Sequence, residues 1–509
     1  MLTEKDRIQI EAHGLNLKQV VGQLETFAKG IPPAKIITAA SAGNGIEVCG
    51  NDTQKELIAY YEARKDKNTI VKFVPASGAA TRMFKFLFEF LENFNPEVET
   101  FNRFVKSGNH TQMEIFAKSI KDFAFVNDVR KKIRENYPEY KQSKKGVRLQ
   151  YFVKSMLEES GLNFGKLPKG LIPFHKYSKY ATTAFEEQLY EAAHYAKSKN
   201  NAYLHFTFSE AHVPFFKEEF ETVKKRVGKK MKTEFHVSYS FQKPETDTIA
   251  VTPENKPFRD AKGKLVFRPS GHGALLENLN EVDADIIFIK NIDNVVAQDY
   301  VADTAEYKKM LAGKLLQVQE QAFHYVSLLN DEGETPEAIA EIKSFLWNDL
   351  NIKDIPNDRS HLIGLLHRPI RVCGVVKNTG APGGGPFWVK NDMGVTSLQI
   401  VETAQIDMED KHQANLVSEA THFNPVDLVC GVKDYLGNKF DLTNYADPNT
   451  GFITEKSQGG KDLKALELPG LWNGAMAKWN SIFVEVPLST FNPVKTVNDL
   501  LQKEHRPNA

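Results

Sequence analysis

Short, apolar, β-branched segments alternate with longer amphipathic segments through most of the chain, and this alternation restricts the folds that it can adopt. Apolar side chains that recur every three or four residues predict helices over 183–198, 213–226 and 305–329. Strand–helix alternation predicts an α/β fold with a mixed, mostly parallel sheet flanked by helices. The expected strands cover residues 69–74, 202–208, 234–240, 286–289, 370–376, 396–403 and 482–486.

Helical periodicity without strand signals sets two other regions apart. Residues 1–66 are expected to form a helical N-terminal segment. Residues 86–165 carry stripes of phenylalanine opposite charged faces, which is typical of helices that pack together as a helical insertion. The insertion would interrupt one α/β domain over 67–500, and 501–509 would form a C-terminal tail.

The charge balance excludes some classes of function. Among 509 residues, 65 Lys and Arg offset 65 Asp and Glu. A formal net charge of zero gives no basis for a nucleic-acid-binding or membrane-binding surface, although a local basic pocket remains possible. The three cysteines show no metal-binding spacing, and neither a signal peptide nor a long apolar run is visible. A cytoplasmic protein is therefore expected.

The most informative segment is a loop of small residues that follows the first expected strand. It reads Pro75-Ala-Ser-Gly-Ala-Ala-Thr-Arg-Met and is expected to open a helix. Small side chains let the backbone approach a ligand, and N–H groups at a helix start favour phosphate. Arg82 would add a fixed positive charge suited to a polyphosphate. A tight packing turn is the alternative interpretation.

The same loop resembles the signature of the sugar-nucleotidyltransferases, in which a Gly-Gly-x-Gly-Thr-Arg segment wraps a nucleoside triphosphate. Gly78, Thr81 and Arg82 are retained, whereas Ser77 and Ala80 stand at two family glycines. A Cβ at those two positions could crowd the triphosphate. The resemblance implies that Ala76, together with Ser77, Gly78 and Thr81, contributes to nucleotide binding.

Later motifs resemble one branch of that group, the UTP–sugar-1-phosphate uridylyltransferases, which include the UDP-glucose and UDP-N-acetylglucosamine pyrophosphorylases. The segments occur in the family order along the chain. They are Leu167-Pro-Lys-Gly, Phe267-Arg-Pro-Ser-Gly-His-Gly, Ile286-Ile-Phe-Ile-Lys-Asn-Ile-Asp-Asn, Val401-Glu-Thr-Ala-Gln-Ile, Leu471-Trp-Asn and Phe491-Asn-Pro-Val-Lys.

This resemblance assigns phosphate and metal roles to four side chains. Arg82, Lys169 and Lys495 would be the catalytic cations that neutralise phosphate charge. Asp293 follows an apolar strand, where open α/β sheets place ligand sites, and a carboxylate there suits Mg²⁺. A helix cap at Asp293 and a solvated loop lysine at Lys169 are the structural alternatives.

The resemblance also implies residues for the base and the sugar. Gln242, Gly271, His272 and Gly273 would bind the nucleotide, and His272 could donate a hydrogen bond to an anion. For these positions the alternative is an ordinary turn. The residues expected to bind the sugar are Glu402, Trp472 and Asn473. Glu402 could instead pair with a basic neighbour, and the loop 383–385 could be a substrate loop or a simple turn.

Together these motifs imply a Rossmann-like nucleotidyltransferase fold of the GT-A type. The implied reaction joins a sugar-1-phosphate to a nucleoside triphosphate, expected to be UTP, with Mg²⁺ and with release of pyrophosphate. A nucleotide-sugar-binding protein that has lost turnover is the alternative, prompted by Ser77 and Ala80. The motifs also resemble an uncharacterised bacterial family known as a domain of unknown function.

Overall fold

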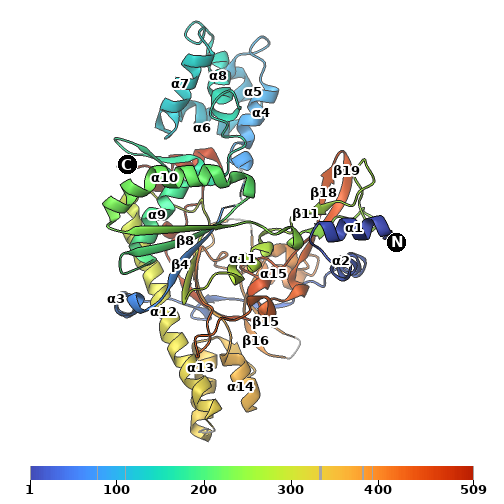
Figure 1. The fold of residues 1–509 in the computed structure, drawn as a ribbon, viewed down its shortest axis with the longest axis vertical. Coiled ribbons are helices and arrows are strands. Elements are labelled where there is room, and N and C mark those ends of the chain that lie inside the picture. The colour runs from blue at the N-terminus through green and yellow to red at the C-terminus, as the bar shows by residue number, and fades with distance from the viewer. Residues whose placement is uncertain are drawn as a thin grey trace. The chain divides into compact units, whose positions relative to one another are not determined.

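The computed structural model describes residues 2–76, 78, 80–108, 110–331, 335–380, 383–391 and 394–507. The chain folds into two compact units, each assembled from separate stretches of sequence (Figure 1). The first unit comprises Met1–Val71, Phe241–Ile289 and Tyr307–Leu488, and the second comprises Lys72–Ser240, Lys290–Glu306 and Ser489–Ala509.

A mixed sheet runs through the first unit in the strand order β2-β3-β20-β14-β17-β12. β14 and β20 are parallel, with Ile370 opposite Asn480, whereas β17 is antiparallel to both β12 and β14. Every residue of β14 and β12 is buried, so these strands form the core of the sheet. The strands are β2 (Ser41–Ala42), β3 (Gly45–Glu47), β20 (Asn480–Glu485), β14 (Ile370–Val375), β17 (Asp427–Gly431) and β12 (Ile286–Ile289).

A second, antiparallel sheet of the first unit has the order β1-β15-β16-β13. Its core joins Ile36 and Phe387 to Leu416 of α15 (Lys411–Ser418). The strands are β1 (Ile36–Ala39), β15 (Gly385–Lys390), β16 (Thr396–Val401) and β13 (Ile352–Lys353). Further elements of this unit are α11 (Leu275–Asn280), the part of α12 (Gln298–Asn330) from Tyr307 onward, α13 (Pro336–Asn348), α14 (Arg359–Leu366), β10 (Thr248–Ile249), β11 (Phe267–Arg268), β18 (Phe452–Gln458) and β19 (Lys461–Glu467).

The N-terminal segment differs from the expectation that 1–66 is helical. Helices α1 (Glu4–Ala12), α2 (Leu17–Lys29) and α3 (Asn51–Arg64) are present, but β1, β2 and β3 lie between α2 and α3. β1 forms because it pairs with β15, about 350 residues away in the chain, with Ala39 opposite Phe387. Such a pairing leaves no periodic signal near residue 36, so the sequence pattern could not predict it.

The second unit contains β4 (Ile70–Pro75), β8 (Asn201–Thr207), β7 (Lys197–Ser198) and β9 (Glu234–Ser240). β8 and β9 are parallel along their whole length. Beside them lie α9 (Ala184–Tyr195), which is almost entirely buried, and the partly exposed α10 (Val213–Met231). A short antiparallel pair, β5 (Pro173–Lys176) and β6 (Ala181–Thr183), leads into α9.

Helices α4 to α8 form the expected helical insertion in this unit (Figure 1). Stacked and edge-on contacts among Phe90, Phe94, Phe101 and Phe104 fill part of its core, which explains the phenylalanine stripes. The helices are α4 (Lys85–Asn93), α5 (Phe101–Ser107), α6 (Thr111–Ser119), α7 (Val126–Asn136) and α8 (Lys145–Leu157).

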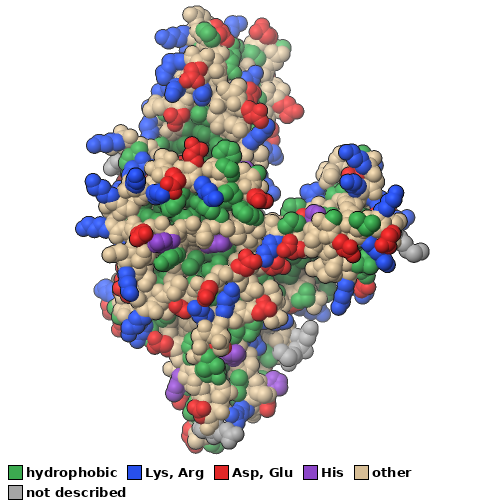
Figure 2. All heavy atoms as spheres, in the orientation of Figure 1, with side chains coloured by type: hydrophobic (Ala, Val, Ile, Leu, Met, Phe, Trp, Pro, Cys, Tyr) green, Lys and Arg blue, Asp and Glu red, His purple; other side chains and the backbone are tan. Residues whose placement is uncertain are grey.

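These elements confirm the predicted fold class, a mixed α/β protein with flanking helices and a helical insertion. Lys, Arg, Asp and Glu side chains are interspersed on the face shown in Figure 2, in keeping with the charge balance of the sequence. None of the helices described here combines the length and apolar character that crossing a bilayer requires.

Candidate functional site

The small-residue loop of the second unit begins where β4 ends. Ala76 donates its N–H to the carbonyl of Thr207, which ties the loop to the end of β8. Gly78 is exposed and has open space where a Cβ would stand. Its carbonyl accepts the N–H of Lys169 at 3.2 Å, so the loop and the Lys169 segment are neighbours. The predicted nucleotide-binding residue Ser77 lies outside the described residues.

The loop leads into a three-residue 3₁₀ turn, Ala80–Arg82, and helix α4 begins only at Lys85. The loop therefore does not open a helix directly, contrary to the expectation. Ala80 is completely buried, and its N–H donates to the carbonyl of Leu167 at 3.3 Å. A buried methyl group cannot contact a ligand on the loop surface, so Ala80 does not crowd a triphosphate there. Thr81 and Arg82 are exposed.

Lys169 and Asp293 form an ion pair at the centre of this region. The Nζ atom of Lys169 lies 2.8 Å from Oδ2 of Asp293 and donates to the carbonyl of Val494 at 2.8 Å. The N–H of Val494 in turn donates to the carbonyl of Asp293 at 3.2 Å. Both side chains are less than a fifth exposed. Three segments that are far apart in sequence thus meet at one ion pair.

Two more of the predicted cations lie on segments that join this cluster. The N–H of Val497 donates to the carbonyl of Met83 at 3.1 Å, which brings the segments carrying Lys495 and Arg82 together. Both side chains are exposed, and neither forms an ion pair with any residue in the described part of the chain. Asp499 accepts the N–H of Lys495 at 2.8 Å and stabilises the turn.

Helix α9 holds the segment that carries Asp293. The buried Gln188 donates Nε2 to the carbonyls of Asn291 and Ile292, at 3.0 and 3.2 Å. One turn later Glu191 forms ion pairs with Lys72 of β4 and with Lys290, at 2.9 and 2.8 Å. All three of these charged side chains are buried. They fix β4 and the end of β12, the two strands from which the loop and Asp293 extend.

The protein residues at this cluster fit Mg²⁺ only if a ligand supplies most of its donors. Within the described ranges, no three His, Cys, Asp or Glu residues are arranged to hold a metal ion. Mg²⁺ is commonly bound through one or two carboxylates together with phosphate oxygens and waters. Asp293 could supply such a carboxylate, provided that Lys169 shifted from it toward the phosphate.

The first unit holds the residues expected to bind the base. The rings of His272 and Trp472 meet edge to face, with centroids 5.8 Å apart. Burial lowers the pKa of His272, and the nearby Glu467 raises it in opposition. At Gly273 a Cβ would lie 2.2 Å from the carbonyl oxygen of Pro469, and Gly271 adopts a positive φ of 80°. Both glycines are therefore required by the packing of this turn.

Glu402 directly follows β16 in the same unit, and burial raises the pKa of its carboxyl, as does Glu467, while Asn424 lowers it. The N–H of Glu402 donates to Oε1 of Gln405 at 2.8 Å. Asn473 is buried and donates to the same Oε1 atom at 3.3 Å. Two predicted sugar-binding residues thus share one hydrogen-bond partner that sequence analysis did not identify.

The remaining predicted residue, Gln242, is partly buried, and its amide donates to Asp247 at 3.4 Å. Sequence reasoning missed Glu467 and Asn424, because an acidic strand residue and a loop amide carry no pattern of their own.

The glycine loop lies close to Glu402, since a Cβ on Gly384 would stand 2.2 Å from the carbonyl oxygen of Val401. Close backbone packing explains that glycine, whereas residues 381 and 382 lie outside the described residues.

The fold and these clusters define a mixed α/β protein with a small-residue loop after β4 and a cluster of charged side chains around Asp293. The chain belongs to the family described as "Domain of unknown function (DUF4301)", which matches residues 3–506. No curated protein matches the chain.

Among solved structures, the chain is similar to a UDP-glucose pyrophosphorylase from Leishmania major in complex with UDP-glucose, with 13% identity and a TM-score of 0.43 over 100% of this chain and 80% of that chain. It is also similar to the uridine diphosphate N-acetylglucosamine pyrophosphorylase from Trypanosoma brucei, with 11% identity and a TM-score of 0.46 over 98% and 79%. A putative UDP-N-acetylglucosamine pyrophosphorylase from Entamoeba histolytica matches at 11% identity and a TM-score of 0.43 over 88% and 82%. Scores and identities this low do not support statements about activity.

Proposed function

We propose that the protein is a nucleotidyltransferase that joins a sugar-1-phosphate to a nucleoside triphosphate, UTP in the first instance, and releases pyrophosphate. One observation carries the proposal: the hydrogen bonds and ion pair around Lys169 and Asp293 gather the Gly78 loop and the segments of Arg82 and Lys495 within one unit. Lys169 and the exposed Arg82 and Lys495 lie on segments that meet in this cluster, and cations gathered in this way suit a polyphosphate.

The reaction needs positioned charge more than a protein nucleophile. An oxygen of the sugar-1-phosphate attacks the α-phosphorus, the bond from that phosphorus to the bridging oxygen of the β-phosphate breaks, and pyrophosphate leaves with the electron pair. Arg82 and the Gly78 backbone are assigned to the β- and γ-phosphates. Lys169 and Lys495 are assigned to the charge that develops around the α-phosphate.

Asp293 is the side chain assigned to Mg²⁺. Bound there, the ion would neutralise phosphate charge, with most of its ligands coming from phosphate oxygens and water. Until Mg²⁺ binds, the ion pair with Lys169 holds the carboxylate of Asp293 in place. A part-buried carboxylate without a partner would cost free energy of folding.

For the rest of the substrate, the proposal assigns the base to Gln242 and the turn from Gly271 to Gly273. The sugar is assigned to Glu402, Trp472 and Asn473. Burial and the neighbouring Glu467 hold the pKa of Glu402 above its ordinary value, so its carboxyl is placed to exchange hydrogen bonds with hydroxyl groups.

The alternative is a nucleotide-sugar-binding protein without turnover. The grounds for this alternative are Ser77 and Ala80, which stand at two family glycines. Because the methyl group of Ala80 is buried, Ala80 does not support the alternative.

Pyrophosphate release separates the two functions. The protein is incubated with UTP, Mg²⁺ and the 1-phosphates of glucose, galactose and N-acetylglucosamine, and we expect release with at least one of them. If no pyrophosphate is released with any of these sugar-1-phosphates while a UDP-sugar still raises the melting temperature, the protein is a nucleotide-sugar-binding protein without turnover. If neither UTP nor a UDP-sugar shifts melting, the uridine assignment is wrong.

A further inference from the structure

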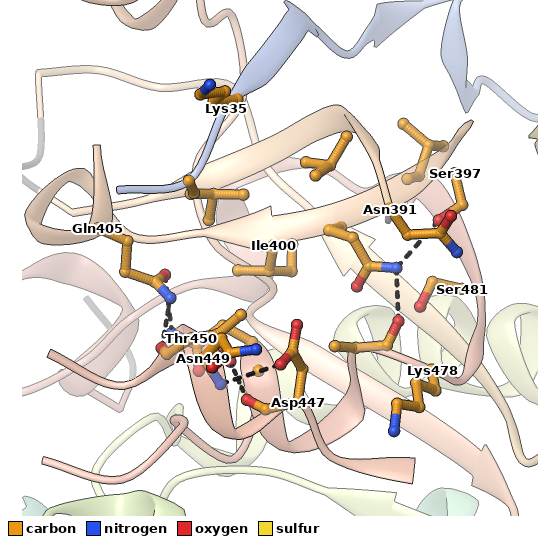
Figure 3. Close-up of a pocket in the computed structure, with 18 of the residues that line it drawn as sticks. Lys35, Asn391, Ser397, Ile400, Gln405, Asp447, Asn449, Thr450, Lys478 and Ser481 are labelled. Atoms are coloured by element: carbon orange, nitrogen blue, oxygen red, sulfur yellow. Dashed lines mark hydrogen bonds between the residues drawn. The ribbon is translucent and has the colours of Figure 1, made fainter. Parts of the chain in front are cut away.

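A cavity of about 840 Å³ lies within the first unit, and none of the residues assigned to the phosphates lines it (Figure 3). Its walls come from β15 and β16, from the start of β20, and from segments at 31–35, 447–453 and 473–479. The volume lies within the range of about 300–1,000 Å³ that is usual for sites that bind small molecules. It therefore has room for a metabolite.

Two cations, Arg368 and Lys478, are among the residues that line this cavity. β14 and β20 are parallel, with Ile370 opposite Asn480, and Arg368 and Lys478 each precede that pair by two residues. The N–H of Asn480 donates to the carbonyl of Pro369 at 2.9 Å, which continues the pairing toward the two cations. The register of the sheet thus brings the backbones of Arg368 and Lys478 to the same edge, and both residues line the cavity.

No carboxylate of the described chain neutralises these two cations by an ion pair. Arg368 is half-buried and donates Nε to the carbonyl of Gly364 at 2.7 Å, and burial lowers the pKa of its guanidinium. The lining contains four basic residues and a single acidic one, Asp447, which accepts the N–H of Asn449 at 2.9 Å. A bound anion would neutralise positive charge that no carboxylate of the described chain pairs with.

Ile400 contributes an apolar wall in the middle of the cavity, where Asp447 also lies, and the other end of the cavity is polar (Figure 3). Ile400 occupies the centre of the view in Figure 3, between the Lys478 and Ser481 end and the Gln405 and Thr450 end. Gln405 donates Nε2 to the carbonyl of Thr450 at 2.5 Å, which fixes the amide in the wall. A site with charge at one end and apolar side chains in the middle fits a molecule that is itself divided in this way.

We propose that this cavity binds a small organic anion, whose phosphate or carboxylate group lies between Arg368 and Lys478 and whose uncharged part extends along Ile400 toward Gln405. Arg368 contributes a bidentate donor fork, which suits either oxyanion, and Lys478 contributes a mobile charge near the solvent. The cavity is distinct from the phosphate cluster of the second unit, which contributes no residue to it, although Asn473, assigned above to the sugar, is part of its wall.

Calorimetric titration of the full chain with glucose 6-phosphate, citrate, inorganic phosphate and glucose tests this proposal. We expect glucose 6-phosphate or citrate to bind, which also distinguishes a phosphate source from a carboxylate source, and glucose not to bind. R368Q and K478M should each weaken that binding at least about tenfold, since each removes one charge-assisted contact. K55M, at an exposed lysine of the same unit, is the matched control and should leave the affinity unchanged.

The second set of variants separates this cavity from the phosphate cluster. An R82A/K495A double variant should bind the same anion as tightly as the unmodified chain does. Loss of binding in that variant would place the anion at the phosphate cluster and overturn the proposal. The proposal is also overturned if neither organic anion binds, if inorganic phosphate binds as tightly as they do, or if K478M, whose exposed side chain is not needed for folding, leaves the affinity unchanged.

Discussion

The ammonium group of Lys169 lies 2.8 Å from the carboxylate of Asp293, although 124 positions separate the two residues in the chain. The same ammonium also reaches the carbonyl of Val494, so one side chain links the ends of three segments. An ion pair at the point where a loop of small residues meets exposed cations is suited to exchange its partners when a phosphate arrives. This pair is therefore the structural basis of the proposed function.

Replacement of Lys169 by methionine should lower the rate of pyrophosphate release by about 10²–10³, because one cation at the reacting phosphate is lost. The stem of the side chain is kept, so most of its packing survives. Initial rates at saturating UTP measure the effect. Lys166→Met changes an exposed lysine three positions earlier and is the control. Equal rates for both variants would remove Lys169 from the mechanism.

Gln188→Met should reduce both stability and turnover although Gln188 is not assigned to a substrate. The substitution leaves the carbonyls of Asn291 and Ile292 without their donor, at a cost of about 1–3 kcal/mol in the free energy of unfolding. It also loosens the segment before Asp293. Urea unfolding and the rate assay are run in parallel, with exposed Gln142→Met as the control. If Gln188→Met lowers the free energy of unfolding but leaves the rate of pyrophosphate release unchanged, Gln188 contributes to the fold and not to turnover.

Glu191→Gln should be strongly destabilising, because it leaves the buried ammonium groups of Lys72 and Lys290 without the carboxylate between them. Breaking a buried ion pair by removing one partner costs about 3–5 kcal/mol. Chemical denaturation measures the loss. The matched change at an exposed pair, Glu114→Gln, should leave the unfolding midpoint where it was. A similar midpoint for both variants would show that the buried charges are compensated in another way.

The buried His505 should make the protein sensitive to acid. Burial and the neighbouring His175, 3.0 Å away, lower the pKa of His505 to about 3, against about 6.5 in an unfolded chain. The unfolded state therefore binds the proton more readily between these values. Stability is present above pH 6.5 and is lost as the pH falls toward 3, by at most about 1.4 kcal/mol per pH unit.

His505→Gln removes this titration, so we expect a flatter dependence of the unfolding free energy on pH between 4 and 6. His324→Gln, at an exposed histidine, should keep the original slope. The slope is the quantity compared, because any substitution at a buried position also lowers stability at every pH. An unchanged slope in His505→Gln would show that other groups cause the sensitivity to acid.

The sequence predicted the elements whose pattern is local. β4, β12 and α10 carry period-two, fully apolar or period-3.6 signals, and the structure confirms each of them. β1 was missed because it pairs with β15, about 350 residues away in the sequence, and β15, which pairs with both β1 and the neighbouring β16, was not predicted either. Local periodicity reports which face of an element is buried, not which segment covers it.

The same distinction applies to the candidate site. Gly78 and Arg82 could be selected from their motif, and Asp293 from its place after an apolar strand. Gln405 and Glu467 could not, because their importance comes from contacts with Asn473 and Lys456 that only the folded chain creates. The Arg368–Lys478 pair was likewise invisible, since it depends on the register of two strands separated by about 100 residues.

Calorimetric titration of UTP tests the central claim most directly, since it asks whether the cluster around Lys169 and Asp293 binds a triphosphate. The account predicts that UTP binds in the presence of Mg²⁺ and that Arg82→Ala and Lys495→Ala each weaken binding at least about tenfold. Lys85→Ala, at an exposed lysine close to Arg82, should leave the affinity unchanged. UTP that fails to bind, or that binds all three variants as tightly as it binds the unmodified protein, would contradict the account.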